Sequence, residues 1–262
     1  VVFANGAGVS GQPVLRLVDA RGGAVAAPGV TAAVEGVVTR VHGRTVWLQD
    51  ATAGLATVAT EGSAFAAAVA AGRILPGDRL VVAGSLGSLN NRQHLTDVRD
   101  GFVVRSRGNA LPTPQQVTLA EITADGEKYE GELVRVEGLQ LVPLREGLFA
   151  PGASYDLRDA SRPSPVGLHV PASDDTEGMP VPFGLFTFEG VLDQSSPFNR
   201  TTGYRLLAVD DHRLAGRHPG EHHHPLADHR PQVDDAALGP AAGNHEHRPL
   251  LAQVDHRLQR HQ

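Results

Sequence analysis

The sequence predicts an all-β protein built from two small five-stranded barrels in tandem. Glycine accounts for 30 and proline for 18 of the 262 residues, a composition that suits many short strands joined by turns. Runs of β-branched residues alternate with Gly, Pro, Asn and Asp clusters at short spacing. The same succession of runs occurs a second time, which indicates two copies of one architecture.

The composition limits what the chain can be. Its length suits two domains of about 100–150 residues. Hydrophobic residues make up 41% but aromatic residues only 5%, so the cores must consist of Val, Leu and Ala. The absence of cysteine excludes disulfides, thiolate zinc sites and cysteine nucleophiles. No run approaches the roughly 18–20 apolar residues of a membrane helix, and the start at Val1 suggests a fragment or a processed chain.

The first repeat covers residues 32–109. Ser63 is expected to cap a short alanine-rich helix that ends at Gly72. The expected strands are residues 34–41, 45–50, 55–59, 79–86 and 94–104, and the helix follows the third of them. Three strands, a helix and two strands is the order of the oligonucleotide/oligosaccharide-binding (OB) barrel.

The second repeat covers residues 129–214. Its expected strands are residues 131–139, 155–160, 166–170, 185–192 and 204–207. A loop, Pro171–Pro182, replaces the helix of the first repeat. Residues 110–128, between the repeats, are expected to form a linker with one helical turn.

Both ends of the chain differ from the repeats. Residues 1–31 hold one strand-like run, Val14–Val18, and are either a leading strand or the end of a truncated immunoglobulin-like repeat. Residues 215–262 carry no aromatic residue, and ten of the thirteen histidines lie at or beyond His212. Such a segment cannot bury enough apolar surface to order itself, so we expect a disordered tail or the product of a shifted reading frame. Its histidines would bind metal only adventitiously, so no metal site is expected.

One family is recognisable in the repeats. The segments "VEGVVTRVHGRTVWLQDATAGLATV" and "LPGDRLVVAGSLGSLNNRQHLTDV" resemble OB-type modules found beside secreted bacterial nucleases of the endonuclease/exonuclease/phosphatase class. The resemblance covers roughly residues 32–212. It implies accessory modules whose catalytic domain lies elsewhere in the parent protein. The matching residues, which then serve turns and barrel closure, are Gly36, Gln49, Asp50, Gly77, Asp78 and Gly84.

A candidate ligand site lies on the second strand of the first repeat and its preceding turn. Strand alternation places Trp47 and Gln49 on the face opposite Val46 and Leu48. An exposed Trp can stack on a base, and arginines can neutralise phosphates. The cluster predicted to bind a ligand is Arg40, His42, Arg44, Trp47 and Gln49. The alternative is that Trp47 caps the core or packs on the linker.

The loop between the last two strands of the first repeat is a second candidate. Asn90, Asn91 and Arg92 occupy a position that contributes to ligand contacts in OB folds. Asparagine is equally a good turn residue, because it tolerates left-handed backbone angles.

The carboxylates do not predict catalysis. Asp50 and Asp159 occupy equivalent places in separate repeats, so they are expected to start turns rather than to converge on a substrate. Asp174, Asp175 and Glu177 lack the spacing of a calcium loop and predict a solvated loop. No phosphate loop, dinucleotide fingerprint or nucleophile elbow occurs, so we expect no enzyme and no cofactor.

The sequence therefore favours a non-catalytic binding module. The first repeat carries eight arginines and six carboxylates, and the second carries seven arginines and thirteen carboxylates. A polyanion such as single-stranded nucleic acid is thus expected on the first barrel, with a polysaccharide as another ligand class. The competing hypothesis is a structural spacer in a large exported protein. Either implies an extracellular or cell-surface location, a catalytic domain elsewhere and no membrane insertion.

Overall fold

The structure of the chain is a computed structural model, which describes residues 14–22, 29–144, 146–160, 163–196, 202–208 and 214–216. Both repeats form strands, so the all-β prediction is confirmed. The predicted tail lies outside the described residues, apart from Ala215 and Gly216. No helix in the described ranges is long and apolar enough to cross a lipid bilayer.

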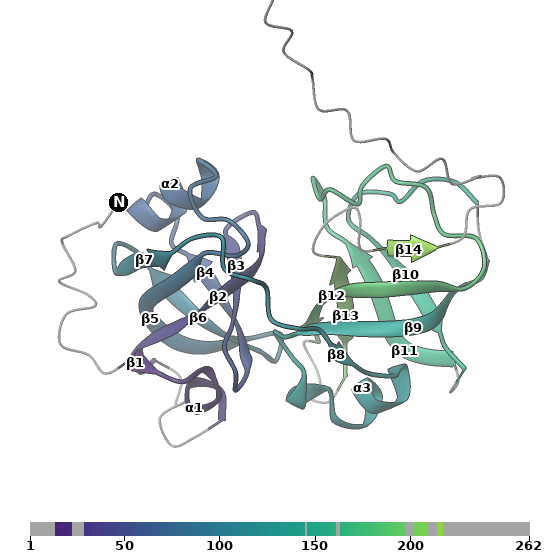
Figure 1. Cartoon of the computed structure of the whole chain (residues 1–262), viewed down its shortest axis with the longest axis horizontal. Coiled ribbons are helices and arrows are strands. Elements are labelled where there is room, and N and C mark those ends of the chain that lie inside the picture. The colour runs from purple at the N-terminus through teal and green to yellow at the C-terminus, as the bar shows by residue number, and fades with distance from the viewer. Residues whose placement is uncertain are drawn as a thin grey trace, which may run out of the picture. The chain divides into compact units, whose positions relative to one another are not determined.

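The first barrel closes in the circuit of an OB fold (Figure 1). Going round the barrel, the order is β2, β3, β4, β6, β5 and back to β2. The pair β4–β6 is parallel, whereas the other pairs around the barrel are antiparallel. The strands are β2 (Thr31–His42), β3 (Thr45–Gln49), β4 (Gly54–Ala59), β5 (Arg79–Leu89) and β6 (Arg92–Val98).

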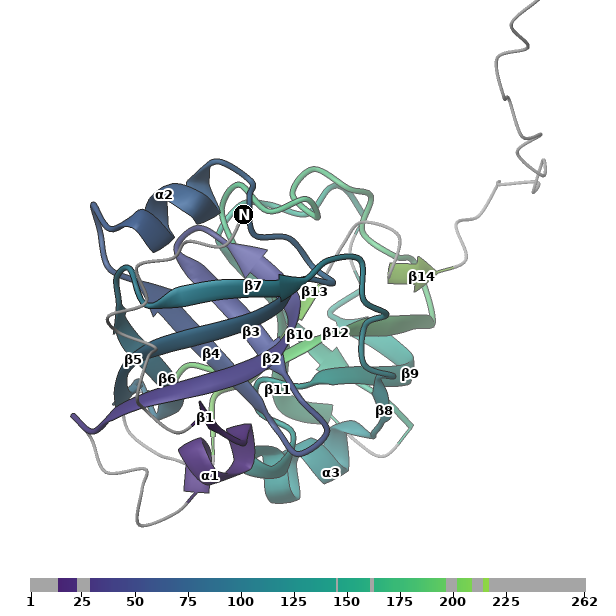
Figure 2. The same cartoon turned by 60° about the vertical axis from the view of Figure 1, so that its left-hand side comes forward.

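A short helix, α2 (Ala64–Ala70), lies between the third and fourth barrel strands, as predicted (Figure 2). The Ser63 side chain accepts the N–H of Ala66 at 3.1 Å and so caps the first turn. Phe65 points from the helix into the first core, where its ring centroid lies 5.0 Å from that of Phe102. Strand alternation fills the rest of this core, with Val46 and Leu48 pointing inward.

The second barrel repeats the circuit. Its order is β9, β10, β11, β13, β12 and back to β9, again with one parallel pair, β11–β13. Residues 171–182 form no helix, as the sequence predicted. The strands are β9 (Leu133–Val142), β10 (Ala153–Arg158), β11 (Pro163–Val170), β12 (Phe186–Gln194) and β13 (Tyr204–Ala208).

Each barrel carries the same flanking elements, of which the sequence predicted only the strand-like run at residues 14–18 and one helical turn within residues 110–128. A two-residue strand pairs in parallel with the first barrel strand and leads into a short helix. A further strand pairs with the start of the fourth barrel strand. These elements are β1 (Val14–Leu15), α1 (Leu17–Gly22) and β7 (Phe102–Ser106) in the first repeat, and β8 (Gln115–Gln116), α3 (Leu119–Asp125), η1 (Gly126–Lys128) and β14 (Leu214–Gly216) in the second.

The flanking elements change two of the predicted assignments. Leu17 is fully buried in the first core, and Val14–Val18 is a strand only at its first two residues because α1 begins at Leu17. The described part of residues 1–31 therefore belongs to the first barrel. Leu119 and Ile122 are fully buried in the second core, so residues 115–128 are part of the second barrel rather than a linker.

Two aspartates fix these flanking helices in the same way. Asp50 Oδ2 accepts the N–H of Leu17 at 3.0 Å, and Asp159 Oδ2 accepts the N–H of Leu119 at 2.8 Å. Each carboxylate therefore ties the end of the second barrel strand to the start of the preceding helix. Asp50 also accepts the N–H groups of Thr52 and Ala53, as its predicted role in a turn requires. Burial alone would raise the pKa of Asp50, but these hydrogen bonds together lower it.

Candidate nucleic-acid interface

A third apolar cluster joins the two barrels, separate from the core of each. Trp47 and Ala56 supply the side of the first barrel, on β3 and β4. Leu133, Val191 and Leu207 supply the side of the second, on β9, β12 and β13. The backbones meet at Gly54 and Gly131, where an added Cβ on Gly54 would lie 2.1 Å from the carbonyl carbon of Gly131.

Trp47 lies at the centre of this contact. It points out of its own barrel, as strand alternation predicted, but only 3% of it is exposed. The guanidinium of Arg40 lies 5.2 Å from the centroid of its ring. A ring enclosed in this way cannot stack on a base unless the barrels separate. The alternative, in which Trp47 caps the core or packs on the linker, agrees with its burial only in part: Leu111 of the predicted linker packs against the same cluster, but the other members of the cluster beyond the first barrel belong to the second barrel.

The side chain of Arg40 binds groups of the second barrel. It is 3% exposed, its Nη2 pairs with Asp174, and its Nε donates to the carbonyl oxygen of Ala208 at 2.7 Å. Burial lowers the pKa of Arg40, and Asp174 opposes that effect. Asp174 was expected in a solvated loop, and that expectation was wrong because its carboxylate balances this buried cation.

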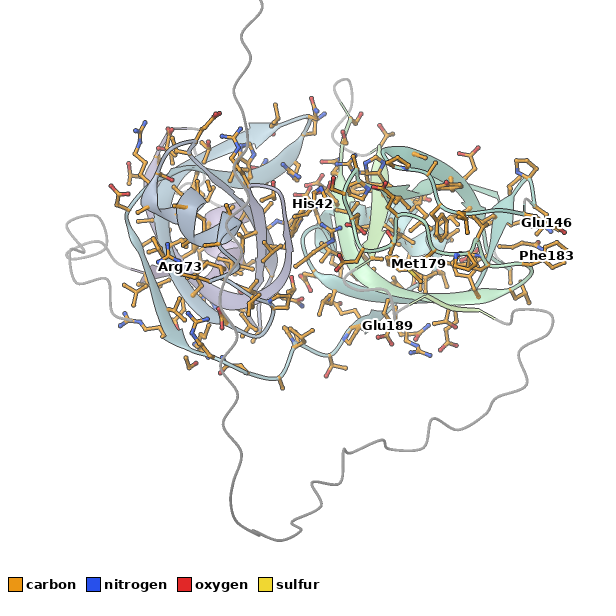
Figure 3. The ribbon with its side chains drawn as sticks, turned by 90° about the horizontal axis from the view of Figure 1, so that it is seen from above. His42, Arg73, Glu146, Met179, Phe183 and Glu189 are labelled. Atoms are coloured by element: carbon orange, nitrogen blue, oxygen red, sulfur yellow. The ribbon has the colours of Figure 1, made fainter. Side chains whose placement is uncertain are left out.

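His42, at the end of β2, and Arg44, in the turn that follows, differ from each other. His42 faces the second barrel (Figure 3), with its Nδ1 3.6 Å from Asp174 Oδ2. Burial lowers the pKa of His42, and the charge of Arg40 adds to that effect. Arg44 is the exception within the predicted cluster, because it is exposed and pairs at 3.5 Å with Glu61 of its own barrel.

Gln49 forms a buried polar bridge at the other end of β3. Its Oε1 accepts the N–H of Leu133 at 2.9 Å, and its Nε2 donates to Glu132 at 3.4 Å. Burial raises the pKa of Glu132, although the charge of Arg21 opposes it. The side chain of Gln49 thus serves the second barrel, not an open ligand face.

The predicted loop of Asn90, Asn91 and Arg92 also contacts the second barrel. Both asparagines have positive φ, 52° and 67°, as their role in a tight turn predicted. The carbonyl oxygen of Asn90 accepts the N–H of Ser196 at 2.9 Å, and Asn91 Nδ2 donates to the Ser196 carbonyl at 2.6 Å. Arg92 pairs at 3.1 Å with the fully buried Asp193.

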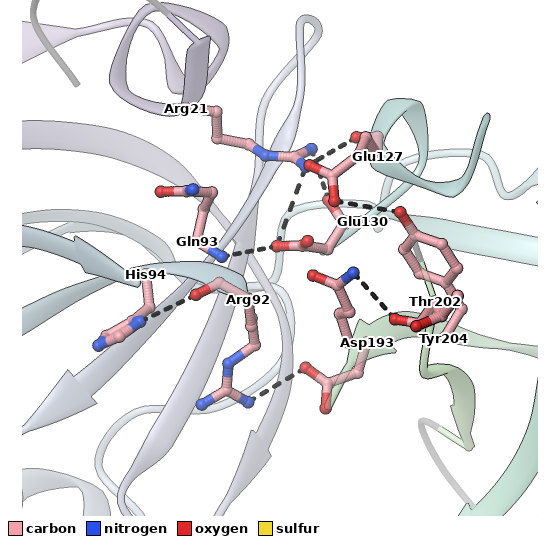
Figure 4. A network of polar contacts seen from close by, with 10 residues as sticks. Arg21, Arg92, Gln93, His94, Glu127, Glu130, Asp193, Thr202 and Tyr204 are labelled. Carbon is pink, nitrogen blue, oxygen red and sulfur yellow. Dashed lines mark hydrogen bonds and ion pairs between the residues drawn. The ribbon is translucent and has the colours of Figure 1, made fainter. Parts of the chain in front are cut away.

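Sequence reasoning missed a polar network beside this loop (Figure 4). Asp193 holds Arg205 at 2.7 Å in addition to Arg92. Arg21, on α1, donates at 2.7 Å to the carbonyl oxygens of Glu127 and Glu130. Carboxylates that a strand buries need partners, so Glu130 and Glu132, at the start of a predicted strand, were the sequence signal for a polar network here.

The second barrel leaves its own second and third strands open. The positions equivalent to Trp47 and Ala56 are Asp156 and Gly167, which offer no ring for stacking. Ser154 Oγ lies 2.9 Å from His169 Nδ1 across this face. Among the described residues, no carboxylate hydrogen-bonds the other ring nitrogen of His169, so the pair lacks the third member of a nucleophilic triad.

Two adjoining hollows lie along residues 110–115 and the turn after β3. They measure about 400 and 420 Å³ and share Gln49, Asp50, Ala51 and Pro112. Their carboxylates, Asp50 and Glu132, are already engaged in the hydrogen bonds described above. The described residues hold no group of three or more His, Asp or Glu side chains placed to bind a metal ion.

Comparisons with known proteins add little. No family model matches the chain, and no curated protein matches it. Among solved structures, one similar chain is a protein from Leishmania major Friedlin assigned as an aspartyl-tRNA synthetase, with 13% identity and a TM-score of 0.32. The match covers 44% of this chain and 24% of that chain. Similarity at this level carries no argument about function, so the residues themselves must supply it.

Proposed function

We propose that the chain is a non-catalytic accessory unit in which the first OB barrel uses its usual ligand face to hold the second. The observation that carries this proposal is the burial of Trp47 and Arg40 against the second barrel. The strand 2–3 face and the loops beside it are where OB barrels contact oligonucleotides. In this chain the same surface serves as a contact between domains.

The proposal favours the spacer hypothesis over nucleic-acid binding. Of the eight predicted ligand residues, Arg44 alone makes no described contact with the second barrel. A phosphate backbone needs several free cations, and Arg40 and Arg92 are each paired with a buried carboxylate. The open face of the second barrel carries Asp156 and belongs to the more acidic repeat.

The proposal also covers the role of the unit within a parent protein. On the resemblance of residues 32–212 to nuclease-associated modules, the unit would position a catalytic domain of an exported or cell-surface protein. In that setting a stiff pair of barrels sets a fixed distance, which a flexible linker of equal length would not. The unit itself would cleave nothing.

A titration with mixed single-stranded oligonucleotides at low salt tests the proposal, because electrostatic binding is strongest there. We expect no change in the fluorescence anisotropy of labelled oligonucleotides up to the highest protein concentration used. Salt-sensitive binding that Trp47→Ala or Arg40→Gln abolishes would restore the first barrel as a nucleic-acid site. Arg99→Gln is the matched control, since that side chain is exposed and lies outside the predicted ligand cluster.

A second measurement tests the unit itself. Trp47 is the chain's single tryptophan, so its fluorescence reports on the inter-barrel contact. We expect blue-shifted emission and weak quenching by acrylamide at pH 5. Emission typical of water-exposed tryptophan would mean that the barrels are separate in solution.

A further inference from the structure

Glu130 connects the two barrels through an enclosed carboxyl group. It is 2% exposed and lies just after η1 of the second repeat. Its Oε1 accepts the backbone N–H of Gln93, on β6 of the first barrel, at 3.0 Å. Its Oε2 is buried without a hydrogen-bond partner among the described atoms. Half of this carboxyl group is therefore shielded from water and from protein donors alike.

The charges that face Glu130 do not balance an ionised carboxylate. Arg21 of α1 approaches no closer than 3.9 Å, because its terminal nitrogens are directed to the carbonyl oxygens of residues 127 and 130. Glu127 of η1 and Asp193 of β12 add like charge. Arg92 of β6 is paired with Asp193, and Tyr204 of β13 donates its hydroxyl to Glu127 (Figure 4).

Burial raises the pKa of Glu130 to about 7, although the charge of Arg21 and the hydrogen bond from the Gln93 N–H oppose it. Ionisation of an enclosed carboxyl group is costly unless water or a donor reaches it. Separation of the barrels removes the two elements of the first barrel that contact Glu130, α1 through Arg21 and β6 through Gln93, and we expect it to open the carboxyl group to water. The ionised form therefore favours separation of the barrels, and the protonated form favours contact.

We propose that Glu130 is a pH-sensitive latch, which holds the barrels together when its carboxyl group is protonated and loosens them when it is ionised. The latch rests on the proposed two-barrel unit and adds a regulation to it. The ratio of open to closed forms rises as pH increases from about 4.5, the ordinary value for Glu, to about 7, and then levels off. The expected rise between pH 5 and pH 8 is roughly 70-fold.

Other ionisable groups at the contact would act differently. Burial lowers the pKa values of His42 and His94, so protonating either one at low pH would loosen the contact. That effect has the opposite sign to the effect of Glu130. Burial also raises the pKa of Glu132, so ionisation of Glu132 would act in the same direction as that of Glu130. Substituting each residue in turn distinguishes the two effects.

Hydrogen exchange at the amide of Leu133 tests the latch, because this N–H donates across the interface to Gln49. We expect its protection, corrected for the intrinsic rate, to fall roughly 70-fold from pH 5 to pH 8 in the unmodified chain. The amide of Leu168, in the second core, exchanges only on unfolding, so it should stay more strongly protected than Leu133 at both pH values. In Glu130→Gln the Leu133 protection should change less than about threefold, whereas Glu132→Gln should retain most of the fall.

Three outcomes of the exchange experiment would overturn the latch. The Leu133 protection does not depend on pH, or it equals that of Leu168, or Glu132→Gln abolishes the dependence while Glu130→Gln keeps it. If Glu130→Gln does not fold, the carboxyl ¹³C shift of Glu130 in the unmodified chain decides, since a midpoint near about 4.5 rules the latch out. Exposed Trp47 at every pH would instead refute the two-barrel unit itself.

Discussion

Trp47 shows how one side chain decides between a ligand site and a domain contact. Its ring is 3% exposed and packs on Leu133, Val191 and Leu207 of the other barrel. We expect Trp47→Ala to reduce the free energy of unfolding by about 3–5 kcal/mol, as for other large buried aromatics. Urea unfolding measures this loss, with Arg44→Ala as an exposed control expected within about 0.5 kcal/mol. A loss for Trp47→Ala as small as that of the control would mean an open face.

Asp193 is the residue on which the polar half of the contact depends. Its fully buried carboxylate holds Arg92 of the first barrel and Arg205 of its own. Asp193→Asn leaves Arg92 and Arg205 without their shared carboxylate, a loss that costs about 3–5 kcal/mol for buried pairs and is expected near the lower end here because Arg205 is 28% exposed. Chemical unfolding of the variant should show this loss, whereas Asp156→Asn, at an exposed position of the open face, should behave like the unmodified chain. Equal stabilities of the two variants would contradict the assigned role.

At the scale of the element, strand alternation predicted which side chains enter each core but not what covers the outer faces. Val46 and Leu48 point inward and Trp47 outward, as expected from the period of two. Nothing in that period tells whether an outward side chain meets water, a ligand or another domain. Two consecutive apolar residues in a strand were the usable signal for a covered outer face. Leu133-Val134 and Val191-Leu192 each place one apolar side chain in the core and one on the outer face of the barrel.

Comparison of the two repeats shows that the surface of the second barrel that holds Trp47 has no apolar counterpart on the first barrel. In the second barrel, Leu133 pairs with Val191, which pairs with Leu207. In the first barrel, the matching chain of partners is Thr31, Ser85 and Thr96, and all three are polar. The first barrel thus lacks the apolar surface that would accept another barrel in the same way. The asymmetry becomes visible only when the repeats are aligned on their strand pairs, which the structure supplies.

The close approach of β4 to the start of β9 makes Gly54 a test at the element scale. An added Cβ would lie 2.1 Å from the Gly131 carbonyl carbon, so Gly54→Ala must push the backbones apart. We expect a red shift of Trp47 emission and increased acrylamide quenching, with both barrels still folded by circular dichroism. Gly22→Ala is the matched control, because nothing lies within 4 Å of its Cβ position. Unchanged Trp47 emission in Gly54→Ala would show that the barrels do not meet at this point.

For the whole molecule, the buried carboxylates between the barrels set the direction of the pH dependence of stability. The pKa of Glu130 is about 7 in the folded chain, against 4.5 for an ordinary Glu, so the folded state binds its proton more tightly than the unfolded state. Its stabilising effect is therefore complete below about pH 4.5 and is lost as pH rises towards 7, by about 3 kcal/mol at most. Urea unfolding at pH 5 and pH 7.5 should show this decrease in the unmodified chain and a smaller one in Glu130→Gln. Glu137→Gln, at an exposed position of β9, should retain the full decrease. Stability that rises over the same interval would mean that the pH dependence is set by the buried histidines His42 and His94, whose lowered pKa values give that sign.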